Sequence, residues 1–181
     1  MALTKIAAGG MPSGSILQVK QSQFLGNEVT NASSFQDVTD LTVSITPLSA
    51  SSKMFISVMI SCHSNDNQRF GVKVVKSVGG GSFSDFLLAD FSAGDLGGAT
   101  TSQGSRLLAH AIGTGRGANV PNDTQSIRLL DSPNTTSALV YKVQAMAEGS
   151  QYVYINNFQT FTDAATVFAP MSTITVMEVA G

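Results

Sequence analysis

The chain is poor in the residues that carry most catalytic and metal chemistry. Its 181 residues include one cysteine, two histidines, no tryptophan and three glutamates. The single cysteine, Cys62, excludes an intrachain disulfide framework. It also excludes a zinc site built from several cysteines of one chain.

Charged residues and long apolar runs are scarce as well. Only 12% of the residues are charged, and the net charge is −2. This share is about half the usual one and provides no basic surface, so we expect no nucleic-acid partner. No stretch approaches the roughly 18 consecutive apolar residues of a membrane helix, so we expect no membrane insertion. Residues 1–14 lack the apolar core of a signal peptide, so we expect no export by the general secretory route.

Serine, threonine, glycine, asparagine and glutamine take the place of the missing charges. Small hydroxyl and amide residues suit strands and turns, whereas helices carry Glu, Lys, Ala and Leu on their exposed faces. Strict alternation of apolar and polar residues, the signal of a strand, recurs along the chain. We expect strands at 15–21, 41–47, 53–62, 69–77, 105–113, 126–132, 138–147, 151–157 and 172–180.

Two of these stretches have apolar residues on both faces. In 53–62, Phe55 and Met59 lie opposite the alternating apolar set, and Met177 does the same in 172–180. If a sandwich buries one side of such a strand, the other side needs a second cover. A subunit interface is a natural cover, so the pattern favours an oligomer.

Turn-forming residues separate the expected strands. They predict loops at 64–68, 77–82, 92–104 and 113–125, and residues 85–91 fit either a short helix or a strand. No stretch has a sustained helical period. Short strands with turns between them predict an all-β fold, an antiparallel β-sandwich or jelly roll of about nine or ten strands.

The N-terminal region is expected to be irregular. Gly9, Gly10 and Pro12 interrupt any regular element before the first alternating stretch. We therefore divide the chain into a short irregular N-terminal arm, residues 1–14, and one β-sandwich domain, residues 15–181.

No motif indicates a reaction. The glycine-rich run 113–120 lacks the helix and the Lys-Ser/Thr end of a phosphate-binding loop, so we interpret it as a loop tip. Cys62 and His63 are adjacent, and neighbours on a strand point to opposite faces. His110 has no acidic neighbour in the sequence, and no nucleophile turn of the G-x-S-x-G type occurs. We expect no catalytic residue, no metal site and no cofactor, although distant residues are able to assemble in space.

Several polar residues have both a structural and a functional interpretation. Asp66 and Asp123 could each give an oxygen ligand to calcium, but one carboxylate per loop favours Asx turns. Glycan acceptor triplets begin at Asn31, Asn122 and Asn134, and chance in a Ser/Thr-rich chain accounts for them.

Three aromatic residues near the C-terminal third leave a similar choice. Tyr152, Tyr154 and Phe158 follow one another along an expected strand. They fit core packing, a stacking surface for a sugar, or contact with a neighbouring subunit.

Four stretches in a fixed order carry a resemblance to a known family. They are GSILQVKQ (14–21), FQDVTDLTVSITPLSASSKMFISVMIS (35–61), LLDSPNTTSALVYKVQ (129–144) and STITVMEVAG (172–181). The set resembles a module in tail fibre and virion appendage proteins of tailed bacteriophages, frequent in phages of cyanobacteria. The resemblance covers about residues 15–181.

The resemblance implies a trimeric jelly-roll-like domain that is displayed on the virion and is not enzymatic. It implies a corner at 131–133, followed by a central strand with Leu139, Tyr141 and Val143. It carries over no catalytic residue, because the shared motifs consist of packing and turn residues. Function would then lie in variable loops.

On this basis we expect three functional regions. The exposed tip loops that engage a host surface glycan or receptor would include Asn65, Asp66, Asn67, Arg116, Asn119 and Asn122. The interface of the homotrimer would include Tyr152, Tyr154 and Phe158. The arm that attaches the chain to other virion proteins would include Ala2, Leu3, Ile6 and Met11.

Two alternatives belong to other functional classes. A capsid decoration (cement) protein that clamps neighbouring capsid subunits would have this size too. A hydrolase acting on surface glycans would need paired carboxylates in a groove. Glu28, Glu148, Glu178 and the aspartates are available for it, and none of them lies in a telling motif.

Overall fold

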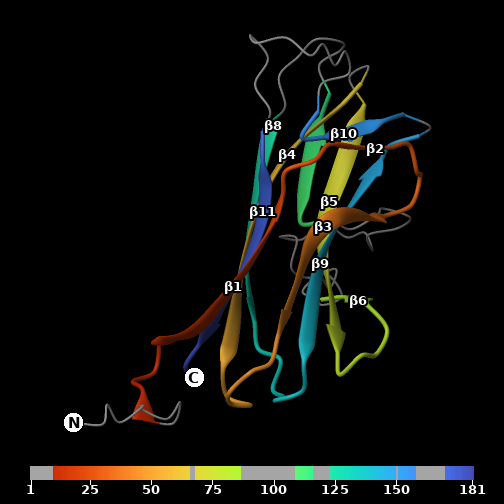
Figure 1. The fold of residues 1–181 in the computed structure, drawn as a ribbon. Coiled ribbons are helices and arrows are strands. Elements are labelled where there is room, and N and C mark those ends of the chain that lie inside the picture. Colours follow the sequence, from red (N-terminus) through yellow and green to blue (C-terminus); the bar gives the residue numbers. More distant parts are fainter. Residues whose placement is uncertain (1–9, 66–67, 87–108, 116–122, 150, 158–169) are drawn as a thin grey trace, which may run out of the picture.

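The computed structural model describes residues 10–65, 68–86, 109–115, 123–149, 151–157 and 170–181, and its strands form two antiparallel sheets packed face to face (Figure 1). The strands are β1 (Ile16–Phe24), β2 (Glu28–Thr30), β3 (Gln36–Ile45), β4 (Lys53–Ser64), β5 (Arg69–Val78), β6 (Ser84–Asp85), β7 (Ala111–Thr114), β8 (Asp123–Asp131), β9 (Leu139–Ala147), β10 (Val153–Ile155) and β11 (Ser172–Val179). The all-β prediction is confirmed, with two strands beyond the nine expected ranges, β2 and β6, which are too short for a readable alternation.

Strand order identifies the sandwich as a jelly roll. We call one layer the β4 sheet, in which β1 pairs with β11, β11 with β4, and β4 with β8. Short β2 and β10 extend the β1 and β11 positions at one end of β4. The other layer, the β9 sheet, has the order β3, β9, β5, with β7 and β6 paired one after the other along the remaining edge of β5. With β6 and β7 counted as one position, and β2 and β10 counted with β1 and β11, eight strand positions remain. Numbered in chain order, they pair as 1-8-3-6 in the β4 sheet and as 2-7-4-5 in the β9 sheet, which is the double-sheet arrangement of a jelly roll.

The core lies between the two sheets and follows the alternation in the sequence. The inward residues of β4 and β9, such as Ile56, Val58, Tyr141 and Val143, are completely buried. The expected central strand is confirmed, since β9 lies between β3 and β5. β3 begins five residues earlier than expected because Asp40, at φ 59°, breaks the alternation where its pairing with β9 shifts register.

A charged link joins the two sheets at one end of the sandwich. Asp131 ends β8 and is 5% exposed. Lys76 Nζ on β5 contacts both of its carboxylate oxygens, at 3.0 and 2.9 Å, and the Tyr141 hydroxyl donates to it at 2.7 Å. Burial and the contact with Asp131 raise the pKa of Tyr141 far above its ordinary value, so the phenol keeps its proton and donates. Asp131 therefore connects strands of both layers.

Buried Asn156 closes the end of β10. Its φ of 51° is one that asparagine tolerates better than most residues. Its side-chain amide donates to the Phe24 and Gly26 carbonyls at 2.8 and 3.1 Å, and it accepts from the Ser172 hydroxyl at 2.6 Å. The end of β10, the start of β11 and the end of β1 are thereby held together.

Candidate functional site: the outer faces of the two sheets

The outer face of the β4 sheet carries an apolar row that crosses four strands. The pairing places Val19 opposite Met177, Met177 opposite Phe55, and Phe55 opposite Leu130. One step toward the chain termini, Ile16 lies opposite Val179. We call these six residues the apolar band: Ile16, Val19, Phe55, Leu130, Met177 and Val179.

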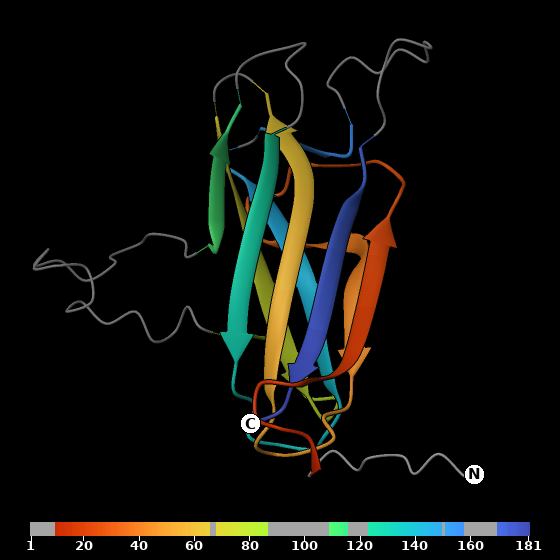
Figure 2. The ribbon, with the colours of Figure 1, turned by 90° about the vertical axis from the view of Figure 1, so that its left-hand side faces the viewer.

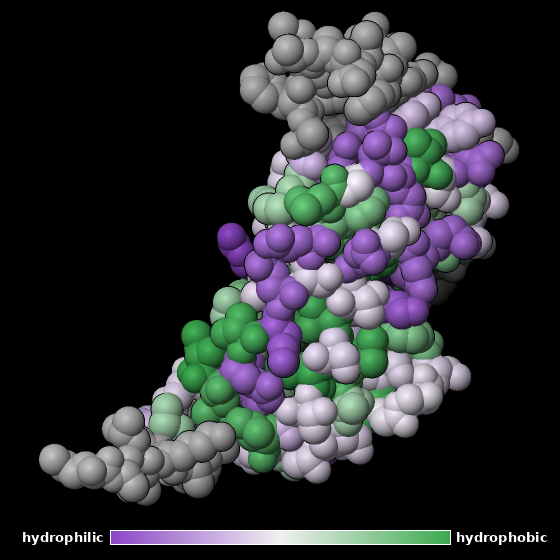
Figure 3. Space-filling view, viewed as in Figure 1, coloured by the Kyte–Doolittle hydropathy of each residue, from purple (hydrophilic) through white to green (hydrophobic). Residues whose placement is uncertain are grey.

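The apolar band is open to solvent in the single chain. Ile16, Val19 and Leu130 are 55%, 52% and 50% exposed, and the other members are half-buried. Figure 2 shows the four strands of this face side by side, and Figure 3 shows apolar side chains gathered over the lower end of β1. The second face of β4, expected to be covered, is thus only half covered within one chain at Phe55 and stays exposed at Met59.

The rest of this face holds almost no charge. The next two rows are Gln21–Thr175–Ser57–Arg128 and Gln23–Thr173–Met59–Ser126. Across these rows and the apolar band with its neighbour Lys53, the described outward positions include two cations and no carboxylate. Taking such a surface out of water costs little, because few charged groups need new partners.

β1 has an inverted pattern that the sequence did not reveal. Val19 points outward, whereas the Gln18 amide donates to the carboxylate of Glu178 at 2.6 Å and to the Thr46 carbonyl at 2.7 Å. Glu178 is fully buried and also accepts from the Leu48 backbone N–H at 2.7 Å. The bulge between Ile16 and Gln18 shifts the register against β11 and places Ile16 on the same outer face as Val19.

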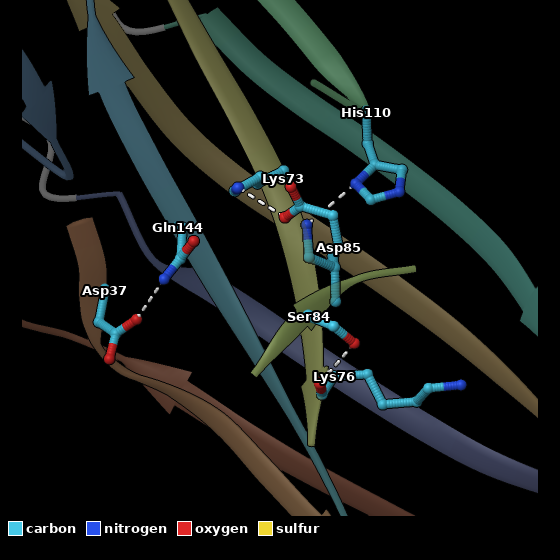
Figure 4. Close-up of polar contacts among 8 residues, drawn as sticks. Asp37, Lys73, Lys76, Ser84, Asp85, His110 and Gln144 are labelled. Atoms are coloured by element: carbon cyan, nitrogen blue, oxygen red, sulfur yellow. Dashed lines mark hydrogen bonds and ion pairs between the residues drawn. The ribbon is translucent and has the colours of Figure 1, made fainter. Parts of the chain in front are cut away.

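The outer face of the β9 sheet is polar and cross-linked. Asp37 accepts from Lys142 at 2.8 Å and from Gln144 at 2.7 Å, and Lys73 contacts Asp85 at 2.6 Å. Figure 4 shows Asp37, Gln144, Lys73 and Asp85 along neighbouring strands. The Lys142 contact lowers the pKa of Asp37, so this carboxylate stays ionised at neutral pH.

Two hollows that share Phe35 in their lining lie on this face, and we call them together the groove. The first hollow has a volume of about 480 Å³, and its lining includes Phe35, Arg69, Gly71, Ile112, Met146 and Glu148. The second has a volume of about 510 Å³ and is lined by Glu28, Val29, Thr30, Phe35, Gln36, Asp37 and Gln144. Both volumes fall in the roughly 300–1,000 Å³ range of small-molecule sites.

The carboxylates in this groove serve local structure. Glu28 accepts the Thr39 backbone N–H at 2.9 Å, and Glu148 accepts that of Arg69 at 3.2 Å. Asp37 has a lowered pKa, the opposite of what a general acid requires. In the part of the chain that the structure describes, no three His, Cys, Asp or Glu side chains gather to hold a metal ion.

His110 is held in its neutral form beside β5. Its Nδ1 accepts the Val74 backbone N–H at 3.0 Å (Figure 4), which requires that this nitrogen carry no hydrogen. Burial lowers the pKa of His110 below its ordinary value of 6.5.

We therefore expect the free energy of unfolding to decrease as the pH falls below about 6.5. The unfolded chain takes up a proton at His110 first, because the folded pKa is depressed. Thermal unfolding between pH 7.5 and 5 checks this, with His110→Gln as the comparison. The stability of the His110→Gln variant should fall less than that of the wild type over this pH range. An equal decline in both proteins would assign it to other groups.

Of the six residues expected at exposed tip loops, the structure describes Asn65. Asn65 is buried, not exposed as expected: its side chain donates to Gln151 at 2.8 Å and accepts from the Tyr152 backbone N–H at 2.9 Å. Asparagine suits this role because it is both donor and acceptor. The other five, Asp66, Asn67, Arg116, Asn119 and Asn122, lie outside the described residues.

The expected interface and arm residues are described in part. Tyr152 is 42% exposed, and Tyr154 stacks on His63 with ring centroids 4.9 Å apart. Met11 is half-buried, and nearby Gly14 donates to the Ala180 carbonyl at 2.8 Å. Phe158, Ala2, Leu3 and Ile6 lie outside the described residues.

The structure places the Cys62-His63 pair and the start of the glycine-rich run 113–120. Cys62 lies in the core, and burial raises the pKa of its thiol, while adjacent His63 stacks on the outer face. The glycine-rich run, expected as a loop tip, begins inside β7. Gly113 and Gly115 are there because neighbouring atoms leave no room for a Cβ.

Comparisons with known proteins give no family. No family model matches the chain, and no curated protein matches it. Two solved structures that match the chain come from infectious bursal disease virus. They are the VP2 subviral particle (8% identity, TM-score 0.37) and the Gx strain (6% identity, TM-score 0.35). Each alignment covers 92% of this chain and 39% of the other, and likeness at this level transfers neither fold nor function. Among the described residues, no helix is long and apolar enough to cross a membrane.

Proposed function

We propose that this chain is a non-enzymatic structural protein of a bacteriophage virion, a homotrimeric tail fibre or appendage displayed for host recognition. The apolar band is the observation that carries the proposal. It presents six apolar side chains across four strands of a rigid sheet, with no carboxylate in the rows beside it. A second copy of the same chain is the occupant that an uncharged, apolar sheet face of this kind fits.

The threefold symmetry and the virion location rest on the resemblance of four ordered stretches to phage appendage proteins. The jelly-roll strand order agrees with the fold that this resemblance implies. Tyr152 and Tyr154 extend the same outer face beyond the apolar band, and we assign them to the subunit interface as well. The described carboxylates of the groove hold backbone N–H groups or cations, which supports a role in structure over one in hydrolysis.

Val19→Lys should dissociate the trimer without unfolding the chain. Val19 is half exposed in one chain, so its replacement leaves the core intact, whereas a lysine buried at the interface would have no carboxylate nearby. Sedimentation velocity should show the variant as single chains of 18.8 kDa. Leu25→Lys is the matched control, because Leu25 is 72% exposed in the turn after β1 and outside the apolar band. Equal masses for both variants would rule out the apolar band as the interface.

Cryo-electron microscopy of the particle tests the location. We expect trimeric density at the tail or at a vertex. Density spread over the capsid faces at local threefold positions would overturn display for host recognition and support the alternative, a capsid decoration protein.

A further inference from the structure

We propose that the groove around Phe35 binds a neutral oligosaccharide of a few sugar units. This inference deepens the proposed function by giving the chemical class of the receptor and the face that binds it. It moves the binding site from the loops to the outer face of the β9 sheet, opposite the apolar band.

The central feature of the groove is the ring of Phe35. It lines both hollows, so a ligand that occupies both contacts it. The ring edge approaches Gly71, where an added Cβ would lie 3.3 Å from it, and Lys73 Nζ is 4.3 Å from the ring centroid. The sheet thus fixes the ring from below. A fixed, half-exposed aromatic ring is a platform for the apolar C–H face of a sugar.

Planar polar side chains stand on both sides of this platform. Arg69 and Glu148 border the first hollow, with side chains 70% and 47% exposed, and Asp37 and Gln144 border the second. Guanidinium, carboxylate and amide groups together donate to and accept from hydroxyl groups. The distribution, polar groups around an apolar surface, matches a ligand with hydroxyls at its rim and C–H groups on its faces.

The charges of the lining select against acidic sugars. The lining holds three carboxylates, Glu28, Asp37 and Glu148, and one cation, Arg69. Because Lys142 pairs with Asp37, one negative charge remains in excess. Two lysines lie nearby, but Lys73 contacts Asp85 and Lys142 contacts Asp37. A sialylated or uronate-containing ligand would meet repulsion here, so the groove fits a neutral chain.

Phe83 provides a matched control for Phe35. It is 40% exposed, and Lys142 Nζ lies 4.2 Å from its ring centroid, as Lys73 does for Phe35. Phe83 lines neither hollow. Replacing it removes a similar lysine–aromatic contact from the same sheet while every residue that lines the two hollows is kept.

The test is a printed array of neutral and acidic oligosaccharides of two to five units, followed by calorimetry with the strongest neutral ligand. We expect binding of neutral chains, a loss of about tenfold or more in affinity for Phe35→Ala, and no change for Phe83→Ala. Absence of binding to every neutral oligosaccharide, or equal binding by Phe35→Ala and the wild type, would overturn the proposal. The oligomer mass is measured separately, so a failure here leaves the trimer claim standing.

Discussion

Replacing Asp131 with alanine should destabilise the protein by about 3–5 kcal/mol, the cost of breaking a buried ion pair by removing one partner. Lys76, with its side chain only 16% exposed, would lose its counter-ion, and the buried Tyr141 hydroxyl would lose its acceptor. The neighbouring Phe86 ring, 5.1 Å from Lys76 Nζ, cannot replace a carboxylate. Chemical denaturation monitored by circular dichroism measures the effect.

The control for this prediction is Asp37→Ala. Asp37 also pairs with a lysine, at 2.8 Å against 2.9 Å for Asp131, but its side chain is 50% exposed. Solvent screens such a pair, and its loss should cost at most about 1 kcal/mol. A double variant, Asp131→Leu with Lys76→Met, should recover the part of the stability that the unpaired lysine costs, since apolar residues of similar volume can replace a buried pair. The part due to the Tyr141 hydroxyl should remain lost, because its acceptor is still missing. Equal losses for the two single alanine variants would contradict this account of the link between the sheets.

Gly115→Ala should cost about 3 kcal/mol, at the upper end of overpacking effects. An added Cβ would lie 1.8 Å from the backbone carbonyl oxygen of Ser64, and a backbone atom cannot move aside as a side chain can. The Gly115 N–H also donates to the Gln68 carbonyl at 2.8 Å, so the segment is held in place.

Thr114→Ala serves as the control, because Thr114 is exposed next to Gly115 and its change should stay within about 0.5 kcal/mol. Thermal unfolding of both variants against the wild type measures the difference. If Gly115→Ala unfolds at the wild-type temperature, this segment is not packed against β4 as described.

The alternation of apolar and polar residues was sufficient to predict the central strands of the fold. β4 and β9 each place a continuous apolar set on one face, and both lie inside their sheets with that face in the core. β11 also lies inside its sheet, with Ile174 and Val176 in the core between buried Ser172 and Glu178. β2 and β6 are three and two residues long and show no readable period, whereas β10 lies inside the strand expected at 151–157. β2 pairs with β10, far away in the chain, and β6 pairs with the end of β5, and a local pattern reports neither pairing.

The surfaces were harder to predict than the core. The shared outward direction of Ile16 and Val19 depends on a bulge in β1, and the apolar band exists only because pairing aligns residues from four separate strands. The sequence carried one signal for the apolar band, namely the apolar residues on the second face of 53–62 and 172–180. The groove had no signal in the sequence, because Phe35 and Gly71 come together only when β3 and β5 flank β9.

The mass of the protein in solution tests the central claim most directly. Light scattering coupled to gel filtration, at micromolar concentration, should give about three times the 18.8 kDa of one chain. That result would support the apolar band as an interface between copies of this chain. A mass of 18.8 kDa at the same concentration would contradict the trimer, and the apolar band would then have to be covered by another protein.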